Sequence, residues 1–186
     1  MQYKGGENMK QPEIILIAAV SENNVIGVEG KIPWRLPEDM KRFANLTTPH
    51  PVIMGRVTYE SIPQKFRPLP NRQNVVLTRD LSFREAGVYV AHSLEDALDV
   101  LEERSAWKDG IDYSKIFIGG GQQVYQAAME YAASLEITHV HQQVPQGKEM
   151  RYFPNIDLTQ WQETKREDRP VQGDKPAYSF VTYEKK

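Results

Sequence analysis

The apolar run IILIAAV occupies residues 14–20 and contains no polar position. Such a run predicts a strand that is buried on both faces, as strands are in a parallel sheet. Shorter runs of the same kind occupy residues 51–55, 74–78, 88–91 and 115–118. Together they predict a largely parallel sheet at the centre of the protein.

Helical patterns lie between these runs. Residues 37–46 begin with a proline, which suits the first position of a helix. Ser93 and Asp96 form a capping box that opens a helix over 94–103. A short helix is expected at 58–62 and a longer one at 122–133. Strands and helices therefore alternate, which predicts an α/β fold.

The last third of the chain has a different pattern. Residues 136–141 and 177–183 alternate between apolar and polar side chains, and residues 161–166 also have strand character. These segments predict an antiparallel hairpin on the edge of the sheet. We therefore expect one α/β domain with about eight mostly parallel strands and about four flanking helices.

The composition limits the possible functions. The chain has 186 residues, a formal net charge of -2 and no cysteine. The near-neutral charge argues against nucleic-acid binding driven by bulk positive charge, and the lack of cysteine excludes disulfide, zinc-thiolate and iron–sulfur sites. No apolar run reaches the roughly 20 residues that span a bilayer, and the N-terminus has no apolar signal-peptide core. We expect a cytoplasmic protein with a flexible extension at 1–12 and one domain over 13–186.

Asp39 is the first candidate functional residue. On a wheel of 3.6 residues per turn it falls within an apolar arc formed by Leu36, Met40, Phe43 and Leu46. An acid in the first turn of a helix can simply offset the helix dipole. Alternatively, a carboxylate in an apolar setting has a raised pKa and pairs with a cationic or amidine-like ligand group. The residue alone leaves both interpretations open.

Two strand-to-helix turns carry residues that suit a phosphate. The turn GGGQQV at 119–124 combines glycines with the start of a helix, where backbone amides favour anions. Arg56 follows Gly55, between the expected strand at 51–55 and the expected helix at 58–62. The dipole at a helix start disfavours a cation unless an anion is bound. Arg79 closes a neighbouring strand. The pattern points to a phosphate-rich ligand at the carboxyl ends of the strands, but a tight turn and two solvated arginines would produce it too.

His139 and His141 are two positions apart on an expected strand, so both lie on one face. The chain has only four histidines in all, and no third ligand is evident nearby. We therefore expect no metal site.

Four segments together resemble the dihydrofolate reductase family. They are IPWRLPEDMKRF at 32–43, VIMGRVTYESI at 52–62, PLPNRQN at 68–74 and GGGQQVY at 119–125. Their order and spacing extend the resemblance over residues 13–185. It implies a twisted, mostly parallel sheet of about eight strands with about four flanking helices. It also implies that NADPH gives a hydride to C6 of 7,8-dihydrofolate and that N5 takes a proton, which yields 5,6,7,8-tetrahydrofolate.

The resemblance implies catalytic roles for Asp39, Trp34, Thr138 and Tyr125. Asp39 would bind the pterin at ring N3 and the 2-amino group, while Trp34 and Thr138 would hold Asp39 and an ordered water. Tyr125 would lie near the nicotinamide. With no base near N5, a water supplies the proton, and Asp39 assists by orienting the ring and raising the basicity of N5.

The same resemblance implies two sets of binding residues, with Arg72 as a clamp on the glutamate α-carboxylate and Thr47 as its brace. The substrate-binding residues would be Ile17, Ala18, Ala19, Asp39, Met40, Phe43, Thr47, Ile62, Leu69, Arg72, Ile118 and Thr138. The NADPH-binding residues would be Ala19, Ile26, Gly27, Gly55, Arg56, Val57, Thr58, Leu77, Thr78, Arg79, Gly119, Gly120, Gly121, Gln122, Gln123, Val124 and Tyr125. Arg56 and Arg79 would bind the 2′-phosphate, so that NADPH is preferred over NADH.

The glycine turn departs from the usual family form. Its length leaves open whether Gly119–Gly120 or Gly120–Gly121 forms the Gly–Gly bond characteristic of the family. Gln123 stands where some members have a phosphate-binding arginine, so that contact would be neutral here. Residues 21–36 resemble the mobile loop that closes over the cofactor.

Two other functions are compatible with parts of this pattern. One is a related NADPH-dependent pyrimidine or pterin reductase, which would not require Asp39 with Trp34, nor Arg72. The other is a non-catalytic pterin-binding module, against which the presence of all the expected catalytic residues argues. The expected partners are a small-molecule substrate and antifolate inhibitors. We expect a monomer that binds neither nucleic acid nor membranes.

Overall fold

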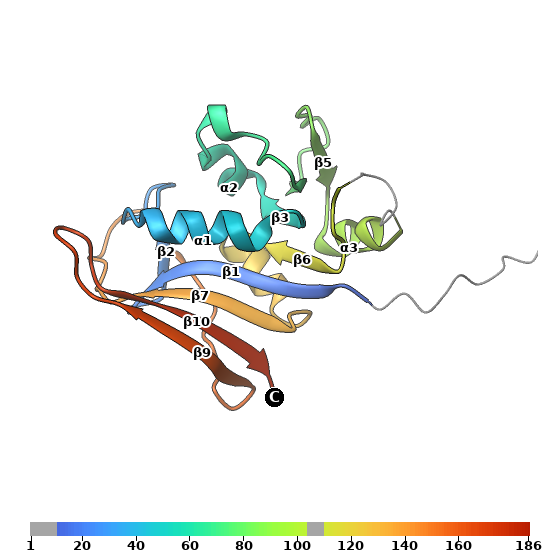
Figure 1. The fold of residues 1–186 in the computed structure, drawn as a ribbon. Coiled ribbons are helices and arrows are strands. Elements are labelled where there is room, and N and C mark those ends of the chain that lie inside the picture. The colour runs from blue at the N-terminus through green and yellow to red at the C-terminus, as the bar shows by residue number, and fades with distance from the viewer. Residues whose placement is uncertain (1–10, 104–109) are drawn as a thin grey trace, which may run out of the picture.

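An eight-stranded sheet forms the centre of the computed structural model, which describes residues 11–103 and 110–186 (Figure 1). The strands in order across the sheet are β5 (Val88–Ala91), β4 (Gln73–Leu77), β3 (Pro51–Gly55), β6 (Lys115–Ile118), β1 (Glu13–Ser21), β7 (Ser134–Val140), β10 (Tyr178–Lys185) and β9 (Trp161–Arg169). Strands from β5 to β7 run parallel to their neighbours, whereas β10 is antiparallel to β7 and β9. This confirms the predicted sheet and its antiparallel hairpin. Residues 1–10 of the predicted extension lie outside the described residues.

Helices cover both faces of the sheet. On one face lie α1 (Pro37–Thr47) and α2 (Arg56–Ser61), which is followed by the short 3-10 helix η1 (Gln64–Phe66). On the other face lie α3 (Leu94–Glu103) and α4 (Gln122–Ala128). Figure 1 shows α1 lying along the sheet beside β1.

Consecutive residues of the central strands pack on opposite faces. In β1, Leu16 joins the apolar cluster beneath α3 and α4, whereas Ile15 and Ile17 join the cluster beneath α1 and α2. Because both faces are covered, every position of the strand must be apolar. This is the physical reason that the unbroken run at 14–20 predicts a buried strand correctly.

The predicted helix over 122–133 is too long. α4 ends at Ala128, whose carbonyl accepts hydrogen bonds from the backbone amides of both Tyr131 and Ala132. The amide of Ala133 then donates to the carbonyl of Ile14 in β1. The helix therefore ends early because the chain joins the sheet at Ala133. The hydrogen bond that does this is made to Ile14, which is far away in the sequence.

A second, two-stranded sheet was not predicted. It pairs β2 (Val25–Gly27) with β8 (Arg151–Tyr152) in antiparallel fashion. Strands this short show no periodicity that could identify them. Their pairing joins the segment after β1 to a distant part of the chain.

The described part of the chain contains no helix that is long and apolar enough to cross a bilayer.

Candidate active site

Asp39 lies in the first turn of α1 and faces β7. The helix begins at Pro37, as the proline predicts, and no side chain caps its N-terminus. Thr138 Oγ1, on a buried residue of β7, donates a hydrogen bond to Asp39 Oδ1 at 2.5 Å. Burial raises the pKa of the Asp39 carboxyl, while the hydrogen bond from Thr138 and the charge of Arg42 oppose that rise. The structure therefore places a mostly desolvated carboxyl against a neutral donor.

The apolar arc expected around Asp39 is only partly formed. Leu36 is buried, and Phe43 and Leu46 pack against the core. Met40, in contrast, is 64% exposed and belongs to neither cluster. It stands at the border of the arc and faces solvent.

Trp34 and Tyr125 supply two further polar groups near this helix. The indole Nε1 of Trp34 is buried and has no hydrogen-bond partner among the described residues. A buried donor of this kind needs an acceptor. The hydroxyl of Tyr125 donates to the carbonyl of Ile17 at 2.7 Å. Burial, with a smaller contribution from the charge of Asp39, raises the pKa of Tyr125, so this phenol stays protonated.

Arg42 and Glu136 form an ion pair that the sequence analysis did not single out. Arg42 stands three positions after Asp39 on α1, and Glu136 two positions before Thr138 on β7. The guanidinium also lies over the ring of Phe180, 4.8 Å from its centroid. The spacings place Arg42 on the same face of α1 as Asp39, and Glu136 on the same face of β7 as Thr138. The sequence could show these two spacings, but not that the two faces meet across 94 positions.

Arg72 is held in a fixed position beside α1. It is 6% exposed, and its Nη1 donates to Thr47 Oγ1 at 3.0 Å while its Nε donates to the carbonyl of Pro70 at 2.9 Å. Thr47 in turn donates to the carbonyl of Phe43. Burial lowers the pKa of Arg72. The hydroxyl of Thr47 thus restrains the guanidinium of Arg72, as predicted for these two residues.

Four of the apolar residues predicted to bind substrate gather on the face of the sheet that α1 covers. Ile17 is buried in the cluster against which Phe43, Ile62 and Leu69 pack. Ile118 has no exposed surface and lies in the cluster on the other face of the sheet. Because strand side chains alternate, Ala18 also packs on that other face, while Ala19 packs beside Trp34. The side chains of Ile118 and Ala18 therefore pack away from that cluster, and their roles in substrate binding stay predictions.

The two predicted turns lie against each other. The amide of Gly55, at the end of β3, donates to the carbonyl of Gly120 at 2.7 Å. The peptide bond between Gly120 and Gly121 is cis. Gly120 has φ +92°, and a Cβ there would come within 2.6 Å of the ring of Tyr125. Only glycine fits this position, and the backbone of both turns can approach a ligand closely.

Arg56 already has anionic partners within the protein. Its Nε contacts Glu60 at 2.8 Å, its Nη1 contacts Asp80 at 2.7 Å, and its guanidinium lies over the ring of Phe83. Hydrogen bonds from Ser82 and Arg56 lower the pKa of Asp80 to about 2, so this carboxylate is ionised. The conflict with the helix dipole is therefore relieved without a bound anion, contrary to the argument made from the sequence.

The remaining predicted cofactor residues have mixed surroundings. Thr58 lies near Gly121, since a Cβ on that glycine would be 3.1 Å from its Oγ1. The side chain of Gln122 accepts a hydrogen bond from the amide of Tyr152 in β8. Three predicted residues pack against the core, namely Ile26, Leu77 and Val124. Three are exposed, namely Val57, Arg79 and Gln123.

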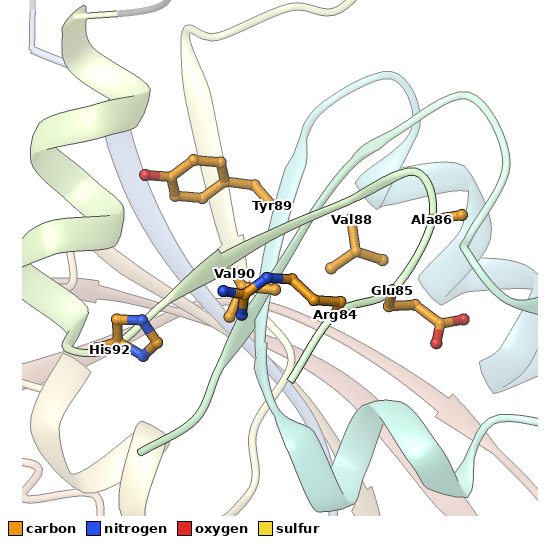
Figure 2. A pocket seen from close by; sticks show the side chains of 7 residues that line it. All are labelled: Arg84, Glu85, Ala86, Val88, Tyr89, Val90 and His92. Carbon is orange, nitrogen blue, oxygen red and sulfur yellow. The ribbon is translucent and has the colours of Figure 1, made fainter. Parts of the chain in front are cut away.

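A hollow of about 560 Å³ lies beside the edge strand β5, away from Asp39. Figure 2 shows the guanidinium of Arg84 extending toward Val90 and His92, while the carboxylate of Glu85 points the other way. The Nδ1 atom of His92 is 2.8 Å from the carbonyl of Thr78. None of the residues that line this hollow was predicted to bind substrate or cofactor, and it is wide open to solvent.

His139 in β7 and His141 just after it lie on the face of the sheet opposite Thr138. His139 Nε2 contacts the hydroxyl of Tyr183 at 2.9 Å, and His141 Nε2 contacts Ser179 Oγ at 2.8 Å. Within residues 11–103 and 110–186, no three side chains of the types that ligate metals form a group. Both imidazoles are therefore part of polar networks between β7 and β10.

Known proteins resemble this chain in both sequence and fold. The family model described as dihydrofolate reductase matches residues 13–185. The dihydrofolate reductase HdrB of Haloferax volcanii is 41% identical over 174 residues, which is 92% of this chain and 83% of that protein. A dihydrofolate reductase of Neisseria meningitidis serogroup A is 42% identical over 171 residues, 92% of this chain and 97% of that protein. A solved structure, dihydrofolate reductase from Enterococcus faecalis complexed with NADP(H) and RAB-propyl, has a TM-score of 0.77 and 32% identity, covering 94% of this chain and 97% of that one.

Proposed function

We infer the roles of individual residues from one premise: this chain belongs to the dihydrofolate reductase family, whose model matches residues 13–185. It is an oxidoreductase that reduces 7,8-dihydrofolate to 5,6,7,8-tetrahydrofolate with NADPH. The observation that carries the residue assignments is the Asp39 carboxyl, mostly buried and bonded to Thr138. A carboxyl in this setting pairs well with an amidine-like group, and the pterin ring presents one at N3 and its 2-amino group.

Asp39 fixes the pterin in the plane needed for reaction. Phe43, Ile62 and Leu69 form the apolar wall around the rings, and Met40 is exposed beside Asp39. Arg72 binds the glutamate α-carboxylate with the fork of its guanidinium, which suits a planar anion. Thr47 keeps that fork in place through the hydrogen bond described above.

The proton for N5 comes from a water molecule. Trp34 supports this step, because its buried indole N–H has no acceptor among the described residues and is available to hold a water near Asp39. The Asp39 charge raises the basicity of N5 by stabilising the cationic ring. C6 accepts the hydride, N5 accepts the proton, and the C6–N5 double bond is thereby reduced to a single bond.

NADPH supplies the hydride from its nicotinamide and fits the carboxyl edge of the sheet. The tight approach of Gly55 to Gly120 leaves backbone, rather than side chains, facing the pyrophosphate. Thr58 and Thr78 contribute hydroxyls there. Arg56 and Arg79 bind the 2′-phosphate, and Glu60 and Asp80 hold the Arg56 side chain at the end of β3.

The test compares NADPH oxidation with and without 7,8-dihydrofolate in the wild type and in Asp39→Asn. We expect oxidation that depends on substrate in the wild type, is largely lost in the variant and partly returns at acidic pH, where solution protons reach N5. If a folded wild type binds NADPH but does not oxidise it with dihydrofolate, the family fold serves another substrate. Full activity of Asp39→Asn would refute the assigned role of the carboxylate.

The proposal includes a monomeric enzyme without a nucleic-acid or membrane partner. The formal net charge of -2 supports the absence of a nucleic-acid partner. Analytical ultracentrifugation of the full chain measures the mass directly, and a dimer at micromolar concentration would contradict it.

A further inference from the structure

Two polar contacts fix α1 on β7 in matching register. Asp39 is bonded to Thr138, and Arg42 is paired with Glu136. Three helix positions advance about 4.5 Å and two strand positions advance about 6.6 Å. The two spacings are close enough for both side-chain pairs to form together, and the helix and strand run in opposite directions. A shift of α1 along β7 would break both contacts.

Two further contacts hold the ion pair, one on Glu136 and one on Arg42. Thr182, the partner of Glu136 in the β10–β7 register, donates from its Oγ1 to both carboxylate oxygens of Glu136, at 3.2 and 3.1 Å. The ring of Phe180 lies beneath the Arg42 guanidinium. The side chains of Arg42 and Glu136 are 18% and 16% exposed, so water screens the pair only in part. The guanidinium is therefore a fixed charge near Asp39, not a solvated one.

Few other charges face Asp39. Burial has the largest effect on the pKa of the Asp39 carboxyl and favours the neutral form, whereas Thr138 and Arg42 favour the ionised form. Tyr125 from α4 and Tyr178 from β10 also feel its charge, but both phenols are protonated. The adjacent Glu38 turns away and bonds to Tyr178 and Arg169. Among the residues that the structure describes, Arg42 is thus the cation that acts on Asp39.

We propose that Arg42, held by Glu136 and Thr182, is a positioning residue for dihydrofolate reduction, which favours the ionised form of Asp39 and keeps α1 in register with β7. It touches neither substrate nor cofactor and acts through Asp39. This inference rests on the proposed role of Asp39 in binding the pterin. Its ionised form is the one that pairs with the ring, so the charge of Arg42 extends binding to lower pH.

The test uses two variants that break the same ion pair with opposite changes of charge. Arg42→Gln removes the cation, and Glu136→Gln removes the anion that partly neutralises it. We expect the midpoint of the Asp39 titration, followed by the ¹³C shift of its carboxyl carbon in the ligand-free protein, to rise in Arg42→Gln and not to rise in Glu136→Gln. Arg42→Lys keeps the charge and should stay near the wild-type midpoint.

A purely structural role predicts something else. Both glutamine variants lose the same contact, so a structural role would move the two midpoints in the same direction. A rise in both, or no rise in folded Arg42→Gln, would overturn the inference. The pH profile of NADPH oxidation with dihydrofolate is measured on the same proteins and should shift with the Asp39 midpoint. If the midpoint moves as expected but the activity profile does not follow, the proposed role of Asp39 fails while the assignment of Arg42 stands.

Discussion

Asp39 and Arg56 differ in how completely the protein satisfies their charges. Asp39 is mostly buried, accepts a hydrogen bond from a neutral threonine and has its pKa raised by burial. Arg56 is partly exposed, contacts two carboxylates and has its pKa raised by them. The sequence indicated a ligand at both positions for the same reason, an unfavourable charge in its local setting. Only at Asp39 does that conflict persist in the folded protein.

The difference separates two kinds of binding group. At Asp39 a cationic or amidine-like ligand supplies the charged hydrogen-bond partner that the protein does not provide. The binding free energy of the ligand therefore includes most of this interaction. At Arg56 a phosphate must compete with Glu60 and Asp80 for the same guanidinium. A ligand therefore gains less from Arg56 than from a buried and unsatisfied charge. The predictions below measure this contrast.

The largest expected effect is the loss of activity in Asp39→Asn. The variant keeps the shape of the side chain and removes its charge, and we expect kcat/KM for dihydrofolate to fall about 10²- to 10⁴-fold at neutral pH. Glu38→Gln is the matched control, because Glu38 is the neighbouring acid on α1 and points to Tyr178 instead. Steady-state kinetics of the two variants provide the comparison. Equal losses in both would show that α1 needs its total charge, not this carboxylate.

Loss of Arg56 and Arg79 together should have a smaller effect. The double alanine variant is expected to lower the ratio of kcat/KM for NADPH to that for NADH about tenfold, because charge-assisted hydrogen bonds to the 2′-phosphate are removed. Rates with both cofactors at fixed ionic strength give the ratio. An unchanged ratio would place the 2′-phosphate elsewhere.

The raised pKa of Asp39 also predicts a dependence of stability on pH. Between the usual aspartate pKa of 3.8 and its raised value, the folded protein binds more protons than the unfolded chain. The free energy of unfolding therefore falls as pH rises through this window. Asp39→Asn removes that loss and should stabilise the ligand-free protein by about 1 kcal/mol at neutral pH, with little gain at the acidic end.

Urea denaturation across a pH series tests this prediction, and Glu38→Gln again serves as control. Tyr178 and Arg169 lower the pKa of Glu38, so its stabilising contribution is present above the unfolded pKa and is lost as pH falls. The two variants should thus change stability in opposite directions at neutral pH. A loss of stability in Asp39→Asn at that pH would contradict the view that burial dominates at Asp39.

The smallest expected effect comes from freeing Arg56. Glu60→Gln removes one of its two carboxylate partners and should tighten NADPH binding about two- to fourfold, in line with the energy of an exposed ion pair. Fluorescence titration with NADPH measures the change, and NADH binding should stay the same. Weaker NADPH binding would mean that Glu60 helps by orienting Arg56 rather than by competing with the phosphate.

The sequence predicted what depends on local pattern and missed what depends on distant partners. The buried strands were found because two covered faces require unbroken apolar runs, and α1 was found from Pro37 and its apolar arc. The end of α4 was misplaced because the amide of Ala133 bonds to Ile14. The pairing of Arg56 with Asp80 was missed because Asp80 stands 24 positions away, whereas its pairing with Glu60 follows an i,i+4 spacing that the sequence does show. The face of β6 that Ile118 occupies was also left open, because a continuous apolar run does not encode that choice.

Strand β9 has a consequence for how the protein behaves when concentrated. It forms one outer edge of the sheet, and an outer edge offers unpaired backbone groups to any second chain. Between Trp161 and Arg169 this strand carries six charged side chains, several joined in exposed ion pairs such as that of Lys165 with Glu167. A second copy could add a strand there only by stripping water from these charges. The opposite edge, β5, is four residues long. Both edges of the sheet therefore disfavour pairing with a strand of a second copy, which is the step that leads to aggregation and fibre growth.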